Sequence, residues 1–240
     1  RVKVANKKKA RKKQIALWLE GARLRTPPLA VAPVAIGAGA AASIQSFNPL
    51  LSALALAVAL FLQIGVNFAN DYSDGIRGTD AKRVGPLRLT GSKSVRPQAV
   101  KFAAFLFFGL AAVAGATIVL LTQHWWFIPV GIAAIVAAWF YTGGKRPYGY
   151  AGFGEIVVFV FFGLVATTGT TFILTGTAPT ESIVAGVAMG SFAAAVLHIN
   201  NVRDRATDIA AGKRTVATRL SPLLGRILYT VLALVPYGAL

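Results

Sequence analysis

Apolar runs of about 20 residues, the length that crosses a bilayer as a helix, recur along this whole chain. The 240 residues are 55% hydrophobic and 14% charged, and the mean hydropathy is +0.63. A soluble domain carries roughly 25% charged residues. The short alternating segments of a transmembrane β-barrel are not visible. The sequence therefore predicts an all-α integral membrane protein, a multi-span helical bundle.

The apolar runs predict seven spans, at 27–45, 49–69, 98–122, 126–142, 153–175, 181–202 and 220–240. A basic, disordered-looking tail is expected over residues 1–14. An amphipathic segment that lies on the membrane surface follows it. Residues 15–240 then form one transmembrane domain. The chain contains no cysteine, which excludes disulfides, thiolate metal sites and a cysteine nucleophile.

Basic residues occupy alternate connections. The connections near 46–48, 123–125 and 176–181 carry no Lys or Arg, and the others carry all 25. Seven spans therefore place every basic residue on one side, which the positive-inside rule assigns to the cytoplasm, together with the N-terminus. The net charge of +17 is concentrated in the tail and these connections. This distribution favours contact with anionic membrane lipid and argues against nucleic acid.

Two short stretches at the basic side hold five of the eight acidic residues: NFANDYSDGIRGTD and HINNVRDRATD. Each places polar side chains three or four residues apart, so that on a helix they share one face. The first stripe is Asn67, Asp71 and Asp74, and the second is Asn200, Asp204 and Asp208. Both stretches follow even-numbered spans, so we expect them to converge in one compartment.

Carboxylates near a membrane core are costly, by about 2.5–3.5 kcal/mol each at mid-depth, and facing carboxylates also repel. Nearby Lys and Arg residues or a divalent cation can offset this cost. Mg²⁺ prefers oxygen ligands and commonly uses one or two carboxylates together with substrate phosphates. Aspartate stripes interleaved with basic residues therefore predict a metal–diphosphate site, with the active site on the cytoplasmic side.

The two stretches NDYSDGIRGTD and NNVRDRATDIAAGKRT resemble the aspartate-rich motifs of the UbiA superfamily of intramembrane prenyltransferases. Within it, WLEGARLRTPPLAVAPV, RVGPLRLTGS, YTGGKRPYGYAGFGEIVVFVFFG and TTGTTFILTG are similar to the branch that acts on 1,4-dihydroxy-2-naphthoate in menaquinone synthesis. The resemblance covers residues 16–240. It implies nine helices around a cavity open to lipid in a prokaryotic cell membrane, so two further spans are expected beyond Leu240.

The resemblance also implies the reaction. Two Mg²⁺ ions hold a polyprenyl diphosphate, loss of diphosphate gives an allylic cation, and this cation attacks the aromatic ring. In this branch the ring carboxylate leaves as CO₂ and the product is demethylmenaquinone. Other aromatic acceptors, such as 4-hydroxybenzoate, homogentisate or a tetrapyrrole, are the alternatives within the superfamily.

Site roles follow from the motifs and their surroundings. The expected metal ligands are Asp71, Asp74, Asp204 and Asp208, with Asp80 ranked below them because Gly78 stands where many superfamily members have an aspartate. Lys145 is expected to stabilise the leaving diphosphate. The other diphosphate-binding candidates are Asn67, Asn70, Asn200, Asn201, Arg146, Lys213 and Arg214.

Two further polar residues have open roles. His198 is either a general base or a satisfied intramembrane polar group. Glu155 either positions the aromatic acceptor or pairs with Lys145 or Arg146.

Two other classes of membrane protein fit the sequence less well. Asp71-Tyr-Ser-Asp74-Gly75 matches only the start of the CDP-alcohol phosphotransferase signature. A cation transporter is disfavoured because the acids lie at one face beside basic residues.

Overall fold

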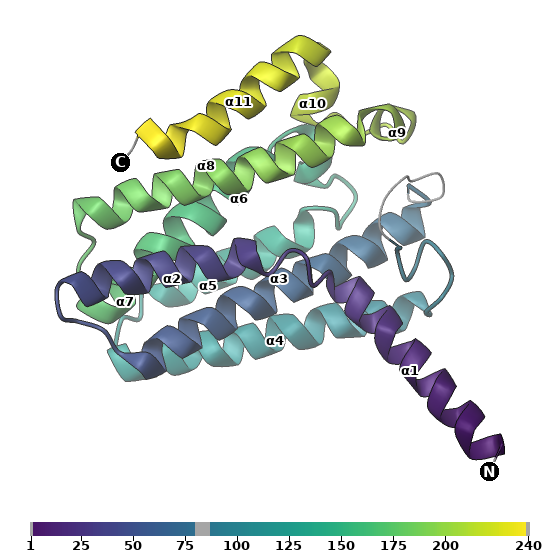
Figure 1. Ribbon diagram of the computed structural model, residues 1–240, viewed down its shortest axis with the longest axis horizontal. Helices are drawn as coiled ribbons and strands as arrows, with labels where there is room; N and C mark the ends of the chain where they lie inside the picture. The colour runs from purple at the N-terminus through teal and green to yellow at the C-terminus, as the bar shows by residue number, and fades with distance from the viewer. Residues whose placement is uncertain (1, 80–86, 239–240) are drawn as a thin grey trace.

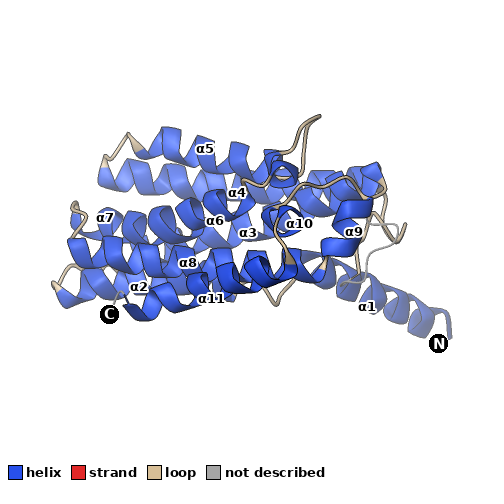
Figure 2. Cartoon of the chain, turned by 90° about the horizontal axis from the view of Figure 1, so that it is seen from above, coloured by secondary structure: helices blue, strands red, loops and turns tan. Residues whose placement is uncertain are grey.

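The protein is a bundle of helices that run roughly along one axis (Figure 1). The computed structural model describes residues 2–79 and 87–238, with side chains from Arg11 onward, and every regular element in these ranges is helical (Figure 2). The bundle is built from α2 (Pro28–Ser43), α3 (Pro49–Arg77), α4 (Pro97–Thr122), α5 (Phe127–Phe140), α6 (Gly154–Val158), η2 (Phe159–Thr168), α7 (Gly169–Thr175), α8 (Thr180–Arg203) and α11 (Pro222–Gly238).

Each of the seven predicted spans corresponds to one of these helices or to a continuous series of them, and α3 continues past its predicted span. Four segments of the described chain are long and apolar enough to cross a membrane by length and composition: Pro49–Arg77, Pro97–Thr122, Gly154–Thr175 and Thr180–Arg203. The other three, α2, α5 and α11, are shorter apolar helices. The all-α membrane architecture predicted from the apolar runs is confirmed.

The basic tail differs from the expected disordered arm. Helix α1 (Val2–Ala22) runs through it without a break and into the amphipathic segment that follows. Lys, Arg and Ala are strong helix formers, and no Gly or Pro interrupts the sequence before Gly21. Figure 1 shows α1 projecting from one end of the bundle. The expectation of disorder was wrong because it used charge and ignored helix propensity.

Both acidic motifs lie at the same end of the bundle. In Figure 1 the last turns of α3 and the end of α8, followed by α9 (Arg205–Ala210), lie at one end, whereas the α2–α3 and α7–α8 turns lie at the other. The remaining short helices, η1 (Tyr148–Ala151) and α10 (Val216–Arg219), belong to the connections of the motif end. The topology therefore brings two segments about 130 residues apart in sequence into one region.

The middle of the fifth span is a π-helix rather than an α-helix. Element η2 packs against α8 at glycines: a Cβ at Gly163 would lie 2.4 Å from the Cα of Gly190. Such small-residue contacts let two helix backbones approach closely inside a membrane, where van der Waals packing replaces hydrophobic burial. The opposite side of η2 carries Phe161, Phe162 and Val165, which line the cavity described below.

Candidate active site

The first motif occupies the last two turns of α3, which continues beyond the predicted apolar span to Arg77. The helix ends at Gly78, whose φ of +75° is the left-handed conformation that suits glycine after a helix. Asp71 and Asp74 are only 1% and 2% exposed. Burying a carboxylate to this extent requires compensating hydrogen bonds or charges, and the two residues obtain them in different ways.

Asp71 binds the backbone of the segment that precedes α4. Its Oδ2 accepts a hydrogen bond from the N–H of Leu89 at 2.7 Å, and its Oδ1 accepts one from the N–H of Thr90 at 2.8 Å. Hydrogen bonds to an ionised group are about twice as strong as those between neutral groups. The carboxylate of Asp71 therefore fixes residues 88–91 against α3.

Gly75, one turn after Asp71, makes this contact possible. A Cβ at Gly75 would lie 2.4 Å from Cγ2 of Thr90, closer than real Cβ contacts come. The absence of a side chain thus lets the 88–91 segment lie directly on α3. This placement carries Arg88, which is 8% exposed, into the site.

Asp74 accepts one short hydrogen bond and faces two cations. The hydroxyl of Tyr150 donates to its Oδ1 at 2.6 Å. Its Oδ2 lies 3.7 Å from Nη2 of Arg88 and 3.9 Å from Nζ of Lys213. Arg88 lies in the stretch RVGPLRLTGS and Tyr150 in YTGGKRPYGYAGFGE. Neither residue was among the site residues predicted from the sequence.

The second motif continues across the end of α8 into α9. The N–H of Asp204 donates to the carbonyl of Asn200 at 3.0 Å, and the N–H of Asp208 donates to the carbonyl of Asp204 at 2.9 Å. These bonds keep the three residues one turn apart although α8 ends at Arg203. The guanidinium of Arg203 donates to both carboxylate oxygens of Asp204, at 2.7 and 2.8 Å.

Lys213 joins the two motifs. Its Nζ lies 3.4 Å from Oδ1 of Asp208 and 3.9 Å from Oδ2 of Asp74, so one ammonium faces a carboxylate from each motif. The same Nζ lies 4.8 Å from the centroid of the Tyr150 ring. The predicted convergence of the two stretches therefore takes place around Asp74, Asp208 and Lys213.

Tyr150 remains a hydrogen-bond donor in this setting. Burial and then the charge of Asp74 raise the pKa of the Tyr150 hydroxyl above its ordinary value of 10.0. The phenol is consequently protonated at neutral pH and donates to the carboxylate.

The other basic residues that were predicted to bind diphosphate lie outside the contact of Lys213 with Asp74 and Asp208. Lys145 and Arg146 are exposed in the turn after α5, and the Arg214 side chain is also exposed, although its backbone N–H donates to the carbonyl of Tyr150 at 2.8 Å. Arg77 donates from its guanidinium to the carbonyls of Thr142 and Gly144. Asp80 lies outside the described residues.

The four predicted asparagines differ in their surroundings: three make hydrogen bonds to other segments, and three line the wall of the cavity. Asn67 donates to the carbonyl of Ala22 at 3.0 Å, and Asn70 accepts from the hydroxyl of Thr142 at 2.8 Å. Asn201 donates to Oε1 of Glu155 at 3.1 Å. The asparagines at the wall of the cavity described next are Asn67, Asn70 and Asn200.

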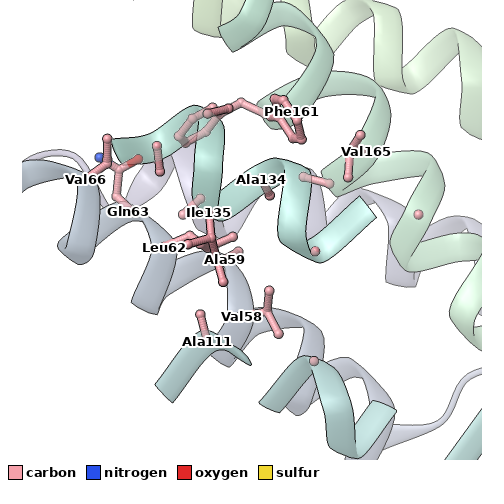
Figure 3. A pocket seen from close by; sticks show the side chains of 18 of the residues that line it. Val58, Ala59, Leu62, Gln63, Val66, Ala111, Ala134, Ile135, Phe161 and Val165 are labelled. Carbon is pink, nitrogen blue, oxygen red and sulfur yellow. The ribbon is translucent and has the colours of Figure 1, made fainter. Parts of the chain in front are cut away.

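A cavity of about 480 Å³ extends from the motifs into the bundle. Its walls are apolar, with contributions from α3, α4, α5, η2 and α8 (Figure 3). The polar groups gather at the motif end, where Asn70, Tyr141 and Asn200 line it. Pockets of this kind, apolar with a few convergent polar groups, are typical of small-molecule sites.

His198 and Glu155 form a separate buried network. Nδ1 of His198 lies 3.2 Å from Oε1 of Glu155, and Nε2 lies 3.0 Å from the carbonyl of Gly225. Both ring nitrogens are therefore engaged, and His198 is 0% exposed. Of the two readings left open by the sequence, this geometry favours the satisfied polar group. Glu155 contacts His198 and Asn201 in place of Lys145 or Arg146.

The carboxylates of the site could hold a hard cation such as Mg²⁺ only together with oxygen atoms of a bound phosphate. Among the described residues, no three His, Asp or Glu side chains gather closely enough to hold a metal by themselves. Asp74 and Asp208 nevertheless face one shared cationic group, and Mg²⁺ commonly takes one or two carboxylates together with substrate phosphates. The residues present therefore fit a metal that is shared with a phosphate ligand.

Comparison with known proteins identifies the family of this chain. Residues 30–240 match the UbiA prenyltransferase family. The chain is 50% identical to a 1,4-dihydroxy-2-naphthoate octaprenyltransferase of Mycobacterium tuberculosis, over 89% of this chain and 73% of the relative. It is 39% identical to the enzyme of the same name from Escherichia coli, over 87% of this chain and 70% of the relative.

A more distant relative is the UbiA prenyltransferase domain-containing protein 1 of Danio rerio, which is 29% identical over 85% of this chain and 61% of that protein. The family match spans both motifs, the cavity-lining helices and the segment that carries Tyr150. The chain belongs to the UbiA prenyltransferase family.

Proposed function

We propose that this protein transfers a polyprenyl group from polyprenyl diphosphate to 1,4-dihydroxy-2-naphthoate, with loss of diphosphate and CO₂, to give demethylmenaquinol, the hydroquinone form of demethylmenaquinone. The observation that carries the proposal is the meeting of Asp74 and Asp208 around Lys213 beside the polar end of an apolar cavity. A diphosphate suits the charged end, and an isoprenoid tail suits the apolar walls. The names of the relatives at 50% and 39% identity supply the acceptor.

In this proposal Asp71, Asp74, Asp204 and Asp208 would hold Mg²⁺, two ions according to the family resemblance, together with the bound diphosphate. Bound Mg²⁺ would supply Lewis-acid neutralisation of the charge that develops on the leaving group. Asp80 remains a weaker candidate ligand. The asparagines of both motifs would bind phosphate oxygens or metal-bound water.

Lys and Arg side chains of the protein would also neutralise the charge that develops on the leaving diphosphate. Lys213 and Arg88 lie within 4 Å of Asp74 and would bind diphosphate oxygens. Lys145, Arg146 and Arg214 are exposed at the same end and would complete the binding of the diphosphate from the solvent side. Fixed cations and donors aimed at a leaving group need no reorganisation during the reaction, which lowers the barrier.

The bonds balance without a further reactant. The C–O bond of the allylic diphosphate breaks and its electron pair leaves with the diphosphate. A ring carbon that bears the carboxylate then forms a bond to the allylic carbon. The carboxylate leaves as CO₂ and returns its electron pair to the ring. The apolar cavity keeps water away from the cation, which would otherwise be trapped as an alcohol.

The location follows from the charge pattern. The motif end of the bundle carries the Lys- and Arg-bearing connections, and the positive-inside rule places such connections in the cytoplasm. We therefore propose a cell-membrane enzyme of a prokaryote whose diphosphate site opens to the cytoplasm and whose cavity contacts membrane lipid.

An acceptor panel tests the proposal. The purified protein in lipid nanodiscs is incubated with polyprenyl diphosphate, Mg²⁺ and one of three acceptors: 1,4-dihydroxy-2-naphthoate, 4-hydroxybenzoate or homogentisate. Mass spectrometry should detect prenylated, decarboxylated product from the naphthoate alone. Turnover on 4-hydroxybenzoate without turnover on the naphthoate would overturn the acceptor assignment and leave the family membership intact.

A further inference from the structure

Tyr150 is the residue at which the contacts between the two motifs meet. It lies in η1, between α5 and α6, in a connection that contains neither acidic motif. Its hydroxyl donates to Oδ1 of Asp74 at 2.6 Å, and its backbone carbonyl accepts from the N–H of Arg214 at 2.8 Å. One residue thus binds the first motif through its side chain and the segment after the second motif through its backbone.

The ring of Tyr150 adds a third contact. Nζ of Lys213 lies 4.8 Å from the ring centroid, and Cζ of Arg77 lies 5.3 Å from it. A cation within about 6 Å of an aromatic ring face is attracted by the ring quadrupole. The ring therefore helps to hold the ammonium of Lys213 between Asp74 and Asp208.

The neighbouring groups fix the tyrosine itself. The hydroxyl of Thr79 lies 3.3 Å from the Tyr150 hydroxyl and 3.1 Å from the backbone carbonyl of Asp74. The N–H of Tyr150 donates to the carbonyl of Pro147 at 3.1 Å. A side chain held at this many points can set the position of the groups that it touches.

We propose that Tyr150 is a positioning residue that keeps the two aspartate motifs at the separation needed to bind a diphosphate. Its hydroxyl orients Asp74, and its carbonyl and ring hold the Lys213–Arg214 segment against it. This inference rests on the proposed function, because it concerns the same diphosphate site. Tyr150 acts through Asp74 and Lys213 and takes no part in bond breaking.

The test compares Tyr150→Phe with Tyr229→Phe, the same substitution on α11 outside the site. Tyr150→Phe removes the hydroxyl and keeps the ring. Binding of inorganic diphosphate in Mg²⁺, measured by calorimetry, should weaken about tenfold, as expected for one hydrogen bond to a charged group. Because Tyr150→Phe also takes a hydrogen bond from the buried Asp74 carboxylate, the melting temperature should fall slightly. The KM for the aromatic acceptor should stay unchanged, and Tyr229→Phe should match the wild type.

A second variant, Tyr150→Leu, removes the ring as well. In metal-free protein it should accelerate amide hydrogen exchange over residues 211–215, because Lys213 loses its aromatic contact. The inference would be overturned by unchanged diphosphate affinity in Tyr150→Phe, or by an affinity loss that only parallels a fall in melting temperature. A wild-type protein that binds diphosphate but prenylates no acceptor would overturn the proposed function alone. A wild-type protein that binds no diphosphate would contradict both.

Discussion

Asp71 and Asp74 belong to one motif and one helix face, yet their carboxylates have different partners. Asp71 accepts two backbone N–H groups, at 2.7 and 2.8 Å, whereas Asp74 faces Tyr150, Arg88 and Lys213. The Asp71 carboxylate therefore organises a loop in addition to its proposed role as a metal ligand, whereas the Asp74 carboxylate lies at the charged centre of the site. Removing either is expected to stop turnover, but for different reasons.

This difference gives a prediction for Asp71→Asn. The amide offers one acceptor oxygen in place of two, and its NH₂ group would face a backbone donor. Since hydrogen bonds to charged groups contribute about 1.5–3 kcal/mol, the free energy of unfolding should fall by about 2 kcal/mol. Thermal or denaturant unfolding in detergent measures the change, and a polyprenyl transfer assay should show that turnover is lost.

Glu181→Gln is the matched control, because Glu181 is an exposed acid at the opposite end of α8. Both its stability, within about 0.5 kcal/mol, and its turnover should equal those of the wild type. Equal stability of Asp71→Asn and Glu181→Gln would contradict the role given to the Asp71 carboxylate in holding the 88–91 segment.

The partners of these carboxylates also show what the sequence could predict about the site. The spacing of the aspartates indicated that each set shares a helix face, and the charge pattern placed both sets on one side. Arg88 and Tyr150 had no such signal, because they reach Asp74 from connections whose path depends on tertiary contacts. One usable signal was Gly75: a glycine one turn after a buried acid can mark the close approach of another backbone.

At the scale of elements, the buried network of Glu155, His198 and Asn201 joins α6 to α8, and His198 extends it to α11. The imidazole contacts Glu155 through Nδ1 and the carbonyl of Gly225 through Nε2. Oε2 of Glu155 is buried and has no hydrogen-bond partner among the residues that the structure describes, so this carboxyl group depends on the contacts made by Oε1. The network is therefore expected to contribute to stability more than a surface ion pair would.

His198→Ala should consequently destabilise the protein by about 3 kcal/mol, because it leaves a cavity and removes a partner from a buried carboxyl group. The melting temperature in detergent measures this effect. His124→Ala serves as the control: His124, in the α4–α5 connection, contacts the rings of Phe127 on α5 and Phe172 on α7. A loss for His198→Ala no larger than that for His124→Ala would contradict the account.

Element boundaries were predictable where apolar runs and breakers define them. The predicted span 98–122 corresponds to α4 (Pro97–Thr122), and 181–202 corresponds to α8 (Thr180–Arg203). The π-helical segment η2 was not predictable, because its apolar sequence has no periodicity that distinguishes a π-helix from an α-helix. Its Gly163 packs closely against Gly190 of α8. The end of α8 at Arg203 was not predictable either, because the helical spacing of Asn200, Asp204 and Asp208 continues past it in the sequence.

At the scale of the whole molecule, the bundle separates charge from apolar surface. Its motif end holds the aspartates and their cations, and the cavity of about 480 Å³ runs from there between the helices. Large apolar side chains such as Phe102 and Val113 on α4 are 69% and 67% exposed and face outward, as expected for contact with lipid. A substrate with a charged head and an isoprenoid tail matches this division.

The cavity leads to a prediction for Gly115→Leu. Gly115 and Val58 both line the cavity, and a Cβ at Gly115 would lie 4.0 Å from Cγ2 of Val58 (Figure 3 labels Val58). A leucine there would narrow the cavity without a backbone clash. The KM for long polyprenyl diphosphates should rise about tenfold while inorganic diphosphate still inhibits at wild-type concentrations, because loss of one to two kcal/mol of apolar contact has that effect.

Gly109→Leu on the same helix is the control, since a Cβ at Gly109 meets no atom within 4 Å and this residue does not line the cavity. It should leave the KM unchanged. An equal KM for both variants and the wild type would show that the isoprenoid tail lies elsewhere.

The release of CO₂ tests the central claim most directly, because it reports donor, acceptor and reaction type together. The protein is supplied with polyprenyl diphosphate, Mg²⁺ and 1,4-dihydroxy-2-naphthoate that carries ¹³C in its carboxylate. The account predicts one labelled CO₂ for each prenylated product, and none when the diphosphate or Mg²⁺ is omitted. Prenylated product that retains the label, or labelled CO₂ formed without the prenyl donor, would contradict it.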